Sequence, residues 1–164
     1  MDQIRLEAER PEHAAAVEDL LDAAFGAGRR AKTCERLREG RAPLRGPSLV
    51  ALAGGRLVGT VRFWPTQVGR TRTLMLGPLA VDPAWARRGT GGLLVREGLA
   101  RARAQGERAV WLVGDAPYYA RFGFDDASTA TWRLPGPVDR TRLLAQALVP
   151  GALARSGGDV AAAA

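Results

Sequence analysis

The segment that most constrains this sequence is a glycine-rich stretch between an apolar run and a helical pattern. Residues 74–81 are mostly apolar and are followed by Asp82-Pro83, which predicts a buried strand closed by a turn. Beyond the glycines, apolar and small residues recur at helical spacing (Leu94, Val95, Gly98, Leu99 and Ala102), which predicts a helix with one face on a sheet. A strand, a glycine turn and a helix N-terminus direct several backbone N–H groups into one concavity, which is typical of a phosphate site.

The loop itself carries positive charge as well as conformational freedom. Its sequence is Arg87-Arg88-Gly89-Thr90-Gly91-Gly92. A dinucleotide-binding loop requires G-x-G-x-x-G directly after a first strand and an acidic residue about twenty positions later, and residues 107–110 do not stand in that setting. A nucleoside-triphosphate loop requires a lysine, and the only lysine is Lys32. The remaining alternative to an anion site is a strand-to-helix turn without a ligand.

Length and composition indicate one globular domain. We expect it to span residues 1–155 of the 164, with residues 156–164 as a frayed tail. No apolar run reaches membrane-spanning length and the N-terminus lacks a signal-peptide core, so we expect a cytoplasmic protein without membrane contact. A single cysteine (Cys34) and a single histidine (His13) argue against an internal disulfide, a metal site and a Cys–His catalytic pair.

The net charge of +7 comes almost entirely from arginine. Such a balance suits a polyanionic cofactor or a nucleic acid. The arginines are scattered, and neither a long basic run nor aromatic interleaving accompanies them. The composition therefore favours the cofactor over nucleic acid.

The order of elements predicts a mixed α/β (α+β) fold. The pattern indicates a short strand at 4–6, an amphipathic helix around 17–25, a polar helix at 31–39, strands at 48–53, 56–64 and 73–81, the helix after the glycine loop, a strand at 109–113, a short helix at 118–122, a hairpin around 124–134 and a loosely helical segment at 141–153. Gly54-Gly55 suits a hairpin turn, and the strand–helix–strand unit implies that strands 73–81 and 109–113 run parallel.

A glycine–proline pair interrupts the third strand of the meander. Gly77-Pro78 predicts a bulge or a point where the sheet opens, because proline cannot donate to the ladder. An open ladder directly before Leu79-Ala80-Val81 leaves backbone groups for an extended, amide-bearing ligand. The alternative is that the pair simply ends the pairing.

Two motifs together resemble the GNAT-type N-acetyltransferases. Residues 83–92, Pro-Ala-Trp-Ala-Arg-Arg-Gly-Thr-Gly-Gly, resemble that family's acetyl-CoA loop, and Tyr119-Ala120-Arg121-Phe122-Gly123-Phe124 resembles its Y-x-x-x-G-F segment. Residues 76–81 and 114–119 look like one bacterial branch of predicted N-acetyltransferases. The resemblance implies a mostly antiparallel sheet of about seven strands, with one parallel pair and about four helices.

The resemblance also implies a cofactor site and a catalytic group. Acetyl-CoA is the implied acyl donor, with Leu79, Ala80 and Val81 along its pantetheine arm and the loop from Arg87 to Gly92 around its pyrophosphate. Arg121 is a further candidate for the phosphates. Tyr119 matches the family's general-acid tyrosine, and Tyr118 is its nearest rival.

The sequence departs from the family pattern at three places. One is Gly114-Asp115, where the family often has an asparagine after the fifth strand. The Gln/Arg position of the loop falls on Ala86, and residues 73–81 hold no acidic side chain to serve as general base. Asp22, Glu35 and Asp115 are unranked candidates for the base.

The implied reaction is direct acetyl transfer to a primary amine in a ternary complex. The acceptor is a small-molecule or protein amine, and the chain is expected to be a monomer or homodimer. The alternatives are a longer acyl donor, a coenzyme A sensor without turnover, and an acyltransferase acting on a nucleic-acid-linked amine.

Overall fold

The computed structural model describes residues 3–164. Met1 and Asp2, the first residues of the domain predicted over 1–155, lie outside the described residues. The strands are β1 (Ile4–Ala8), β2 (Leu49–Ala53), β3 (Arg56–Val68), β4 (Thr71–Val81), β5 (Ala109–Val113), β6 (Trp132–Arg133), β7 (Leu143–Ala147) and β8 (Gly158–Ala162). The helices are α1 (Ala14–Phe25), α2 (Thr90–Ala104) and α3 (Ala116–Ala120), with the 3-10 turns η1 (Pro11–His13), η2 (Ala27–Ala31), η3 (Thr33–Leu37), η4 (Pro83–Trp85) and η5 (Arg140–Arg142).

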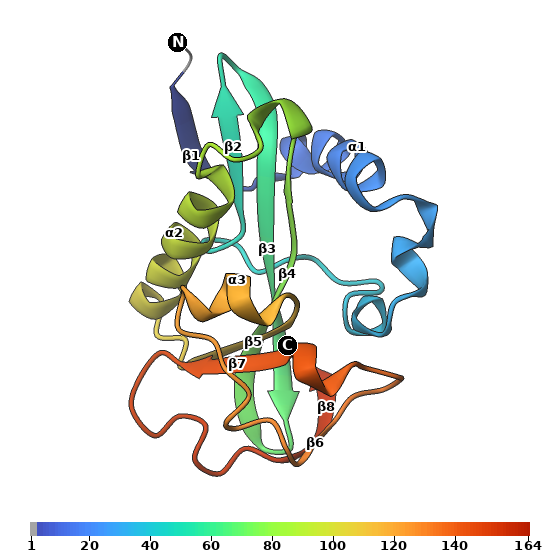
Figure 1. The fold of residues 1–164 in the computed structure, drawn as a ribbon, viewed down its shortest axis with the longest axis vertical. Coiled ribbons are helices and arrows are strands. Elements are labelled where there is room, and N and C mark those ends of the chain that lie inside the picture. The colour runs from blue at the N-terminus through green and yellow to red at the C-terminus, as the bar shows by residue number, and fades with distance from the viewer. Residues whose placement is uncertain (1–2) are drawn as a thin grey trace.

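The described strands form one mixed sheet in the order β1-β2-β3-β4-β5-β7, and β8 pairs with both β3 and β6 (Figure 1). Neighbours are antiparallel except for β4 with β5 and β6 with β8. The hairpin at Gly54-Gly55 and the parallel β4–β5 pair are therefore confirmed. The predicted fold class is confirmed as well.

The two long helices cover opposite faces of the sheet. Alternate residues of β2 divide between them: Leu49 and Ala51 pack in the cluster that includes α2, and Val50 packs in the cluster that includes α1. This division follows from the period of two in a strand. Helix α2 packs on β3, and the N-terminal end of α2 lies beside the end of β4 (Figure 1). No described helix is both long and apolar enough to cross a bilayer.

The sheet opens in the middle of β4. The β3–β4 register passes from Phe63↔Leu76 to Val61↔Leu79, so that Gly77 and Pro78 stand opposite one residue of β3. The predicted bulge is therefore confirmed, and the Trp64 indole fixes it by donating to the Gly77 carbonyl at 2.6 Å.

The bulge marks the place where the two parallel strands part. β4 pairs with β5 only at Leu74 and Met75. Among residues 3–164, no strand covers that edge of β4 from Leu76 to Val81.

Four predicted segments are wrong. The hairpin expected around 124–134 does not form, because Trp132 and Arg133 pair in parallel with β8 and Asp125 bridges Ala145 of β7. The polar helix expected at 31–39 is two 3-10 turns, because Lys32 is extended and because Thr33 and Arg36 donate to the carbonyls of Pro137 and Pro135 instead of continuing a helix. The segment at 141–153, expected to be helical, contains strand β7, since all five residues of β5 require a partner on that edge.

The tail expected to fray over 156–164 forms β8. It is held by pairing with residues 66–68 of β3 and by Val160, which is only 4% exposed.

Candidate functional site

The open edge of β4 offers free backbone groups. Asp82 N–H donates to the Val58 carbonyl at 2.8 Å, so the backbone groups of Asp82 and Ala80 face β3. In an antiparallel pair, alternate residues face opposite edges, and the N–H and C=O groups of Leu79 and Val81 therefore face the opening. Three residues are predicted to line an extended ligand. Leu79 and Val81 direct their backbone groups toward the opening, and Ala80 directs its backbone groups toward Thr60 of β3.

The glycine loop curls into the start of α2. Arg87 and Gly89 both have positive φ (63° and 81°), and no side chain caps the helix. The first N–H groups of α2 are thus left without intrahelical acceptors, at the positive end of its dipole. The Thr90 hydroxyl in the same turn is buried and has no hydrogen-bond partner among the described residues. This orphaned donor and the uncapped helix end fit a bound phosphate.

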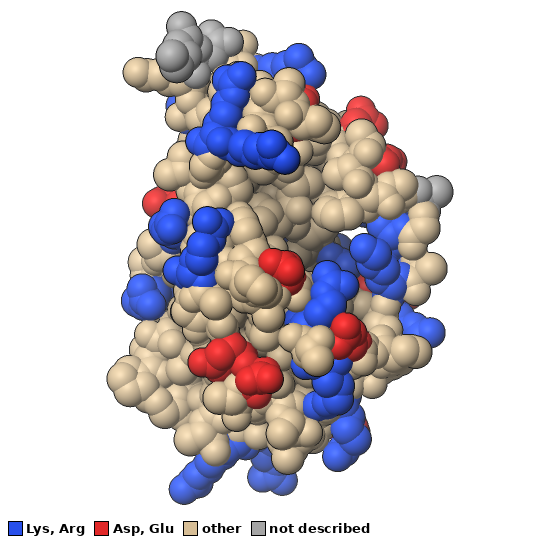
Figure 2. All heavy atoms as spheres, in the orientation of Figure 1, with Lys and Arg blue, Asp and Glu red and all other residues tan. Residues whose placement is uncertain are grey.

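The aromatic side chains of α3 close this site from the other side. A Cβ on Gly91 would lie 3.0 Å from the Tyr118 hydroxyl, so the start of α2 and α3 are in close contact at this residue. The Arg121 guanidinium stacks on the Tyr118 ring, with 4.6 Å from its central carbon to the ring centroid. Arg88 lies in the same way over Trp85, at 4.7 Å. Figure 2 shows basic side chains over the N-terminal end of α2 and near α3.

Tyr119 lies deeper than its neighbour. Its ring packs against Phe124 edge-on, and a Cβ on Gly114 would come within 2.5 Å of it. Burial, followed by the nearby Tyr118, raises the pKa of Tyr119 to about 12. The phenol is therefore protonated at neutral pH and can donate a proton.

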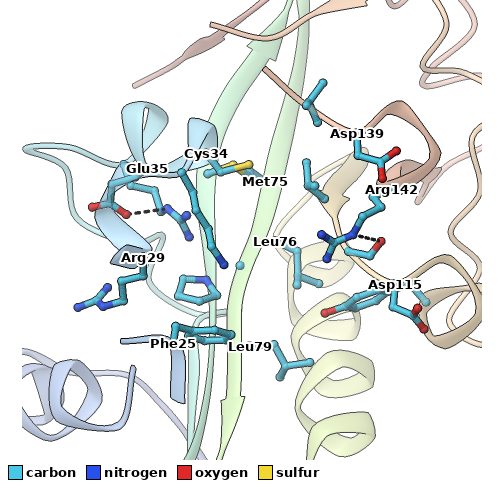
Figure 3. Close-up of a pocket in the computed structure, with 18 of the residues that line it drawn as sticks. Phe25, Arg29, Cys34, Glu35, Met75, Leu76, Leu79, Asp115, Asp139 and Arg142 are labelled. Carbon is cyan, nitrogen blue, oxygen red and sulfur yellow. Dashed lines mark hydrogen bonds and ion pairs between the residues drawn. The ribbon is translucent and has the colours of Figure 1, made fainter. Parts of the chain in front are cut away.

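The opening between β4 and β5 widens into a cavity of about 570 Å³. Both tyrosines line it, together with η2, η3 and the segment around Asp139. Figure 2 shows the surface hollowed between α3 and the η2–η3 segment. Figure 3 shows Glu35 and Arg29 on one side of β4, and Asp115 and Arg142 on the other.

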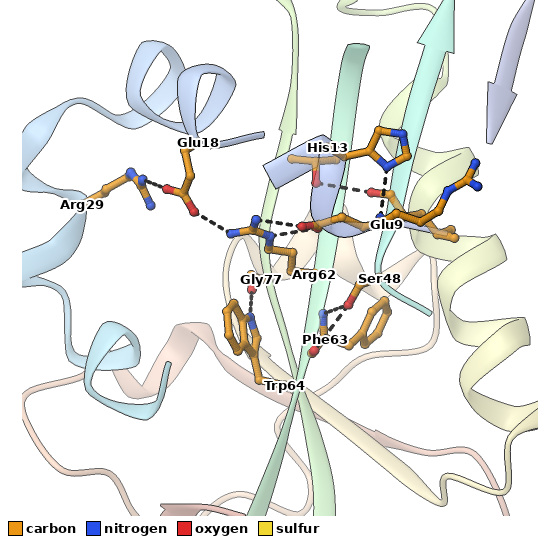
Figure 4. A network of polar contacts seen from close by, with 12 residues as sticks. Glu9, His13, Glu18, Arg29, Ser48, Arg62, Phe63, Trp64 and Gly77 are labelled. Atoms are coloured by element: carbon orange, nitrogen blue, oxygen red, sulfur yellow. Dashed lines mark hydrogen bonds and ion pairs between the residues drawn. The ribbon is translucent and has the colours of Figure 1, made fainter. Parts of the chain in front are cut away.

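A buried ionic network holds one wall of this cavity. Arg62 of β3 is 6% exposed and donates twice to Glu9 and once to Glu18, all at 2.9 Å. Arg29 of η2 donates to the same Glu18 and to Asp22 (Figure 4). The network connects η2, through Arg29, to α1 and β3.

The three unranked candidates for the base have different surroundings. Asp22 does not line the cavity and is paired with Arg29. Asp115 lines the cavity but accepts from Tyr118 N–H as the cap of α3. Glu35 lines the cavity and pairs with Arg38 at 3.4 Å. β4 carries no acidic side chain, as its sequence indicates.

Most of the predicted cofactor residues converge on one stretch of surface from Val81 to α3. Ala86, which replaces the usual Gln/Arg, is exposed and extended after η4. Sequence reasoning missed Arg96, whose guanidinium lies over Phe122 and would be 3.1 Å from a Cβ on Gly92. Its position four residues after Gly92 places it on the same helix face, a signal that was available from spacing alone.

The site has the features that a long, polyanionic, amide-containing ligand requires. An open strand edge can pair with amides, an uncapped helix with an orphaned hydroxyl can receive phosphate, and a cavity continues past the strand end. These features form a continuous path over β4, the loop and α3.

Comparison with known proteins identifies relatives among the N-acetyltransferases. The model of the Acetyltransferase (GNAT) family matches residues 14–124. The chain is 36% identical over 123 residues to the uncharacterized N-acetyltransferase YhbS of Escherichia coli. The aligned region makes up 73% of this chain and 72% of YhbS. The chain is 31% identical over 113 residues to the uncharacterized N-acetyltransferase YjhQ of Escherichia coli. The aligned region makes up 66% of this chain and only 62% of YjhQ.

Two solved structures resemble the whole fold. YhbS from Escherichia coli in complex with CoA superposes with a TM-score of 0.85 at 30% identity, over 99% of this chain and 91% of that one. A GNAT family acetyltransferase from Brucella melitensis in complex with acetyl-CoA gives 0.73 at 31% identity, over 99% and 97%. Because the family model matches residues 14–124 of the 164 and YhbS is 36% identical over 73% of this chain, the chain belongs to the GNAT acetyltransferase family.

Proposed function

We propose that this protein transfers an acetyl group from acetyl-CoA directly to a primary amine held in the cavity beside β4. The observation that carries the proposal is the continuity of the open β4 edge, the uncapped start of α2 and the cavity lined by Tyr118 and Tyr119. The relatives in complex with CoA and acetyl-CoA support the choice of donor.

Each part of the donor has a matching group in this chain. Leu79 and Val81 offer backbone hydrogen bonds to the pantetheine amides. The loop from Arg87 to Gly92 receives the pyrophosphate through N–H groups, the Thr90 hydroxyl and the two arginines. Arg121, stacked on Tyr118, supplies a further cation near the phosphates.

The chemistry requires a donor for the carbonyl oxygen and a proton for the sulfur. Acetyl-CoA supplies the activated acyl group. A free N–H on the open edge, at Leu79 or Val81, polarises a carbonyl in this place, since a preorganised donor in a dry site stabilises developing negative charge. The amine nitrogen bonds to the thioester carbon as the C–S bond breaks, and the proton that the amine loses passes to solvent. Tyr119, which is protonated at neutral pH, donates a proton to the departing thiolate.

The first measurement is calorimetric titration of the purified protein with acetyl-CoA, desulfo-CoA and ATP. We expect both CoA forms to bind and ATP not to bind, because only the CoA forms carry amides for the β4 edge. Failure of both CoA forms to bind a folded protein would refute the proposed function.

The second measurement compares Tyr119→Phe with its neighbour Tyr118→Phe in a thiol-release assay. Loss of a general acid lowers kcat about 10²- to 10⁴-fold, so Tyr119→Phe should lose turnover in that range with unchanged acetyl-CoA affinity. Tyr118→Phe, with the same atom removed from the next residue, should retain kcat within a few fold. Equal turnover in the wild type and Tyr119→Phe would contradict the assigned role. Binding without turnover of any amine would instead favour the sensor.

A further inference from the structure

Arg38 lines the cavity beside β4, and its side chain is 11% exposed. Its Nε is buried and has no hydrogen-bond partner among residues 3–164. The same Nε lies 3.4 Å from Glu35 Oε2, an ion pair without a hydrogen bond. Burying donors in this way is costly unless an acceptor arrives.

The two neighbouring buried arginines are fully engaged, which makes Arg38 different. Arg62 donates to Glu9 and Glu18, and Arg29 donates to Glu18 and Asp22. These three carboxylates therefore already accept hydrogen bonds from Arg29 and Arg62, which leaves Arg38 Nε without an acceptor among residues 3–164. Burial, together with the nearby charges of Arg29 and Arg62, lowers the pKa of Arg38, an effect that an incoming anion would reverse.

The position of Arg38 faces the reacting end of the proposed site. Its Nη1 lies 3.8 Å from where a Cβ on Gly77 would stand, so the guanidinium reaches over the bulge. The same cavity is lined by Tyr118 and Tyr119 on the far wall. A ligand that touches both walls would place one end at Arg38 and the other at the open edge of β4.

Of the described acidic groups that line the cavity, only Glu35 is paired with Arg38, through Nε at 3.4 Å and without a hydrogen bond. Asp115 and Asp139 are occupied as caps that accept from the backbone N–H groups of Tyr118 and Thr141. The Lys32 ammonium, 5.2 Å from the centroid of the Phe25 ring, adds a second cation to the Arg38 side of the cavity.

We propose that the acceptor of this enzyme is a small amine that also carries a carboxylate, and that Arg38 binds the carboxylate while the amine lies at the open edge of β4. This inference rests on the proposed function. A planar guanidinium with paired donors matches the two oxygens of a carboxylate. A cavity of about 570 Å³, shared with the acyl end of the donor, suits a molecule of amino-acid size.

The test is a matched panel of acceptors in the thiol-release assay. It contains L-amino acids and ω-amino acids from glycine to 6-aminohexanoate, each beside its carboxamide, with 2-aminoethyl phosphate as the phosphate counterpart. The ω-amino acids act as a ruler, because the rate should peak at the length that spans Arg38 and the β4 edge. We expect the best carboxylate to exceed its amide about 10- to 100-fold in kcat/KM, as for a charge-assisted pair.

The variant Arg38→Gln assigns that preference to one residue. It should lose about 10- to 100-fold in kcat/KM for carboxylates, lose little for amides, and keep the KM for acetyl-CoA. Arg70→Gln, which removes the same charge from the exposed β3–β4 turn, is the control and should behave as wild type. If Arg38→Gln does not fold by circular dichroism, Arg38→Lys keeps the charge without the paired donors and should show a smaller loss in the same direction.

Other outcomes overturn the inference without touching the proposed function. The inference is overturned if carboxamides are acetylated as well as carboxylates, or if Arg38→Gln loses equal activity toward both. It is also overturned if 2-aminoethyl phosphate is the preferred acceptor. In each case turnover persists and the proposed function stands. If no panel member is acetylated, melting temperatures with the same panel and CoA decide the question. A stabilisation by carboxylates that is absent for amides and in Arg38→Gln supports the inference, and no stabilisation by any member refutes it. Failure of acetyl-CoA to bind would refute the proposed function separately.

Discussion

A single phenol, that of Tyr119, links the chemistry of this site to the stability of the fold. Burial raises its pKa from an ordinary 10.0 to about 12, so the unfolded chain loses this proton before the folded one does. The stabilisation from this group is therefore complete below about pH 10 and is lost as the pH rises toward about 12.

Urea unfolding at several pH values between about 9 and 11 tests this expectation. The free energy of unfolding of the wild type should fall more steeply with pH than that of Tyr119→Phe, because phenylalanine has no proton to lose. Tyr118→Phe is the matched control and should keep most of the wild-type slope, because it removes only a smaller cause of the raised Tyr119 pKa. Parallel curves for the wild type and Tyr119→Phe would show that the phenol titrates alike in both states.

At the scale of the elements, helix α2 packs tightly on the sheet, and this contact depends on Gly98. A Cβ there would stand 2.5 Å from Phe63 Cε1 and 3.1 Å from the Pro47 carbonyl oxygen, and Phe63 is fully buried. Gly98→Ala gains about 1 kcal/mol of helix propensity but overpacks the core, which costs about 1–3 kcal/mol. We expect a net loss of stability in urea unfolding and a raised KM for acetyl-CoA, since the start of α2 must move.

Ala100 is an exposed residue of the same helix, so a substitution there changes helix propensity without changing the packing of the core. Ala100→Gly should lose about 1 kcal/mol and leave the KM for acetyl-CoA unchanged. A Gly98→Ala protein that is more stable than the wild type would show that α2 and the sheet tolerate the extra methyl group.

At the scale of the whole molecule, the sheet is completed by its last strand. β8 lies between β3 and β6, and Val160 is buried in the cluster that contains Trp132 and Val68. Deleting residues 158–164 should lower the free energy of unfolding by at least about 2 kcal/mol, the worth of burying one valine, as measured in urea. If the deletion prevents folding, Val160→Ala should give a smaller loss. A frayed tail would instead contribute nothing measurable in either variant.

Much of the fold could be predicted from local pattern. The hairpin at Gly54-Gly55 and the bulge at Gly77-Pro78 are confirmed because each depends on residues adjacent in the chain. The parallel β4–β5 pair is confirmed because a strand–helix–strand connection sets the relative direction of its two strands. The segments at 31–39, 141–153 and 156–164 were wrong because distant partners determine their conformation: the carbonyls of Pro135 and Pro137, the edge of β5, and the edge of β3.

The candidate site divides in the same way. By itself, the sequence determined the loop from Arg87 to Gly92 and the tyrosine pair, since glycine torsions, helix starts and short motifs are local properties. The Gly77-Pro78 pair predicted an opened ladder, but only the tertiary structure decided that Leu79 and Val81, and not Ala80, face the uncovered edge. It alone placed Arg38 in the same cavity as Tyr119 with its Nε lacking a hydrogen-bond partner among the described residues. Strand pairing and the burial of a charge are set by segments far apart in the chain, so no local pattern contains them.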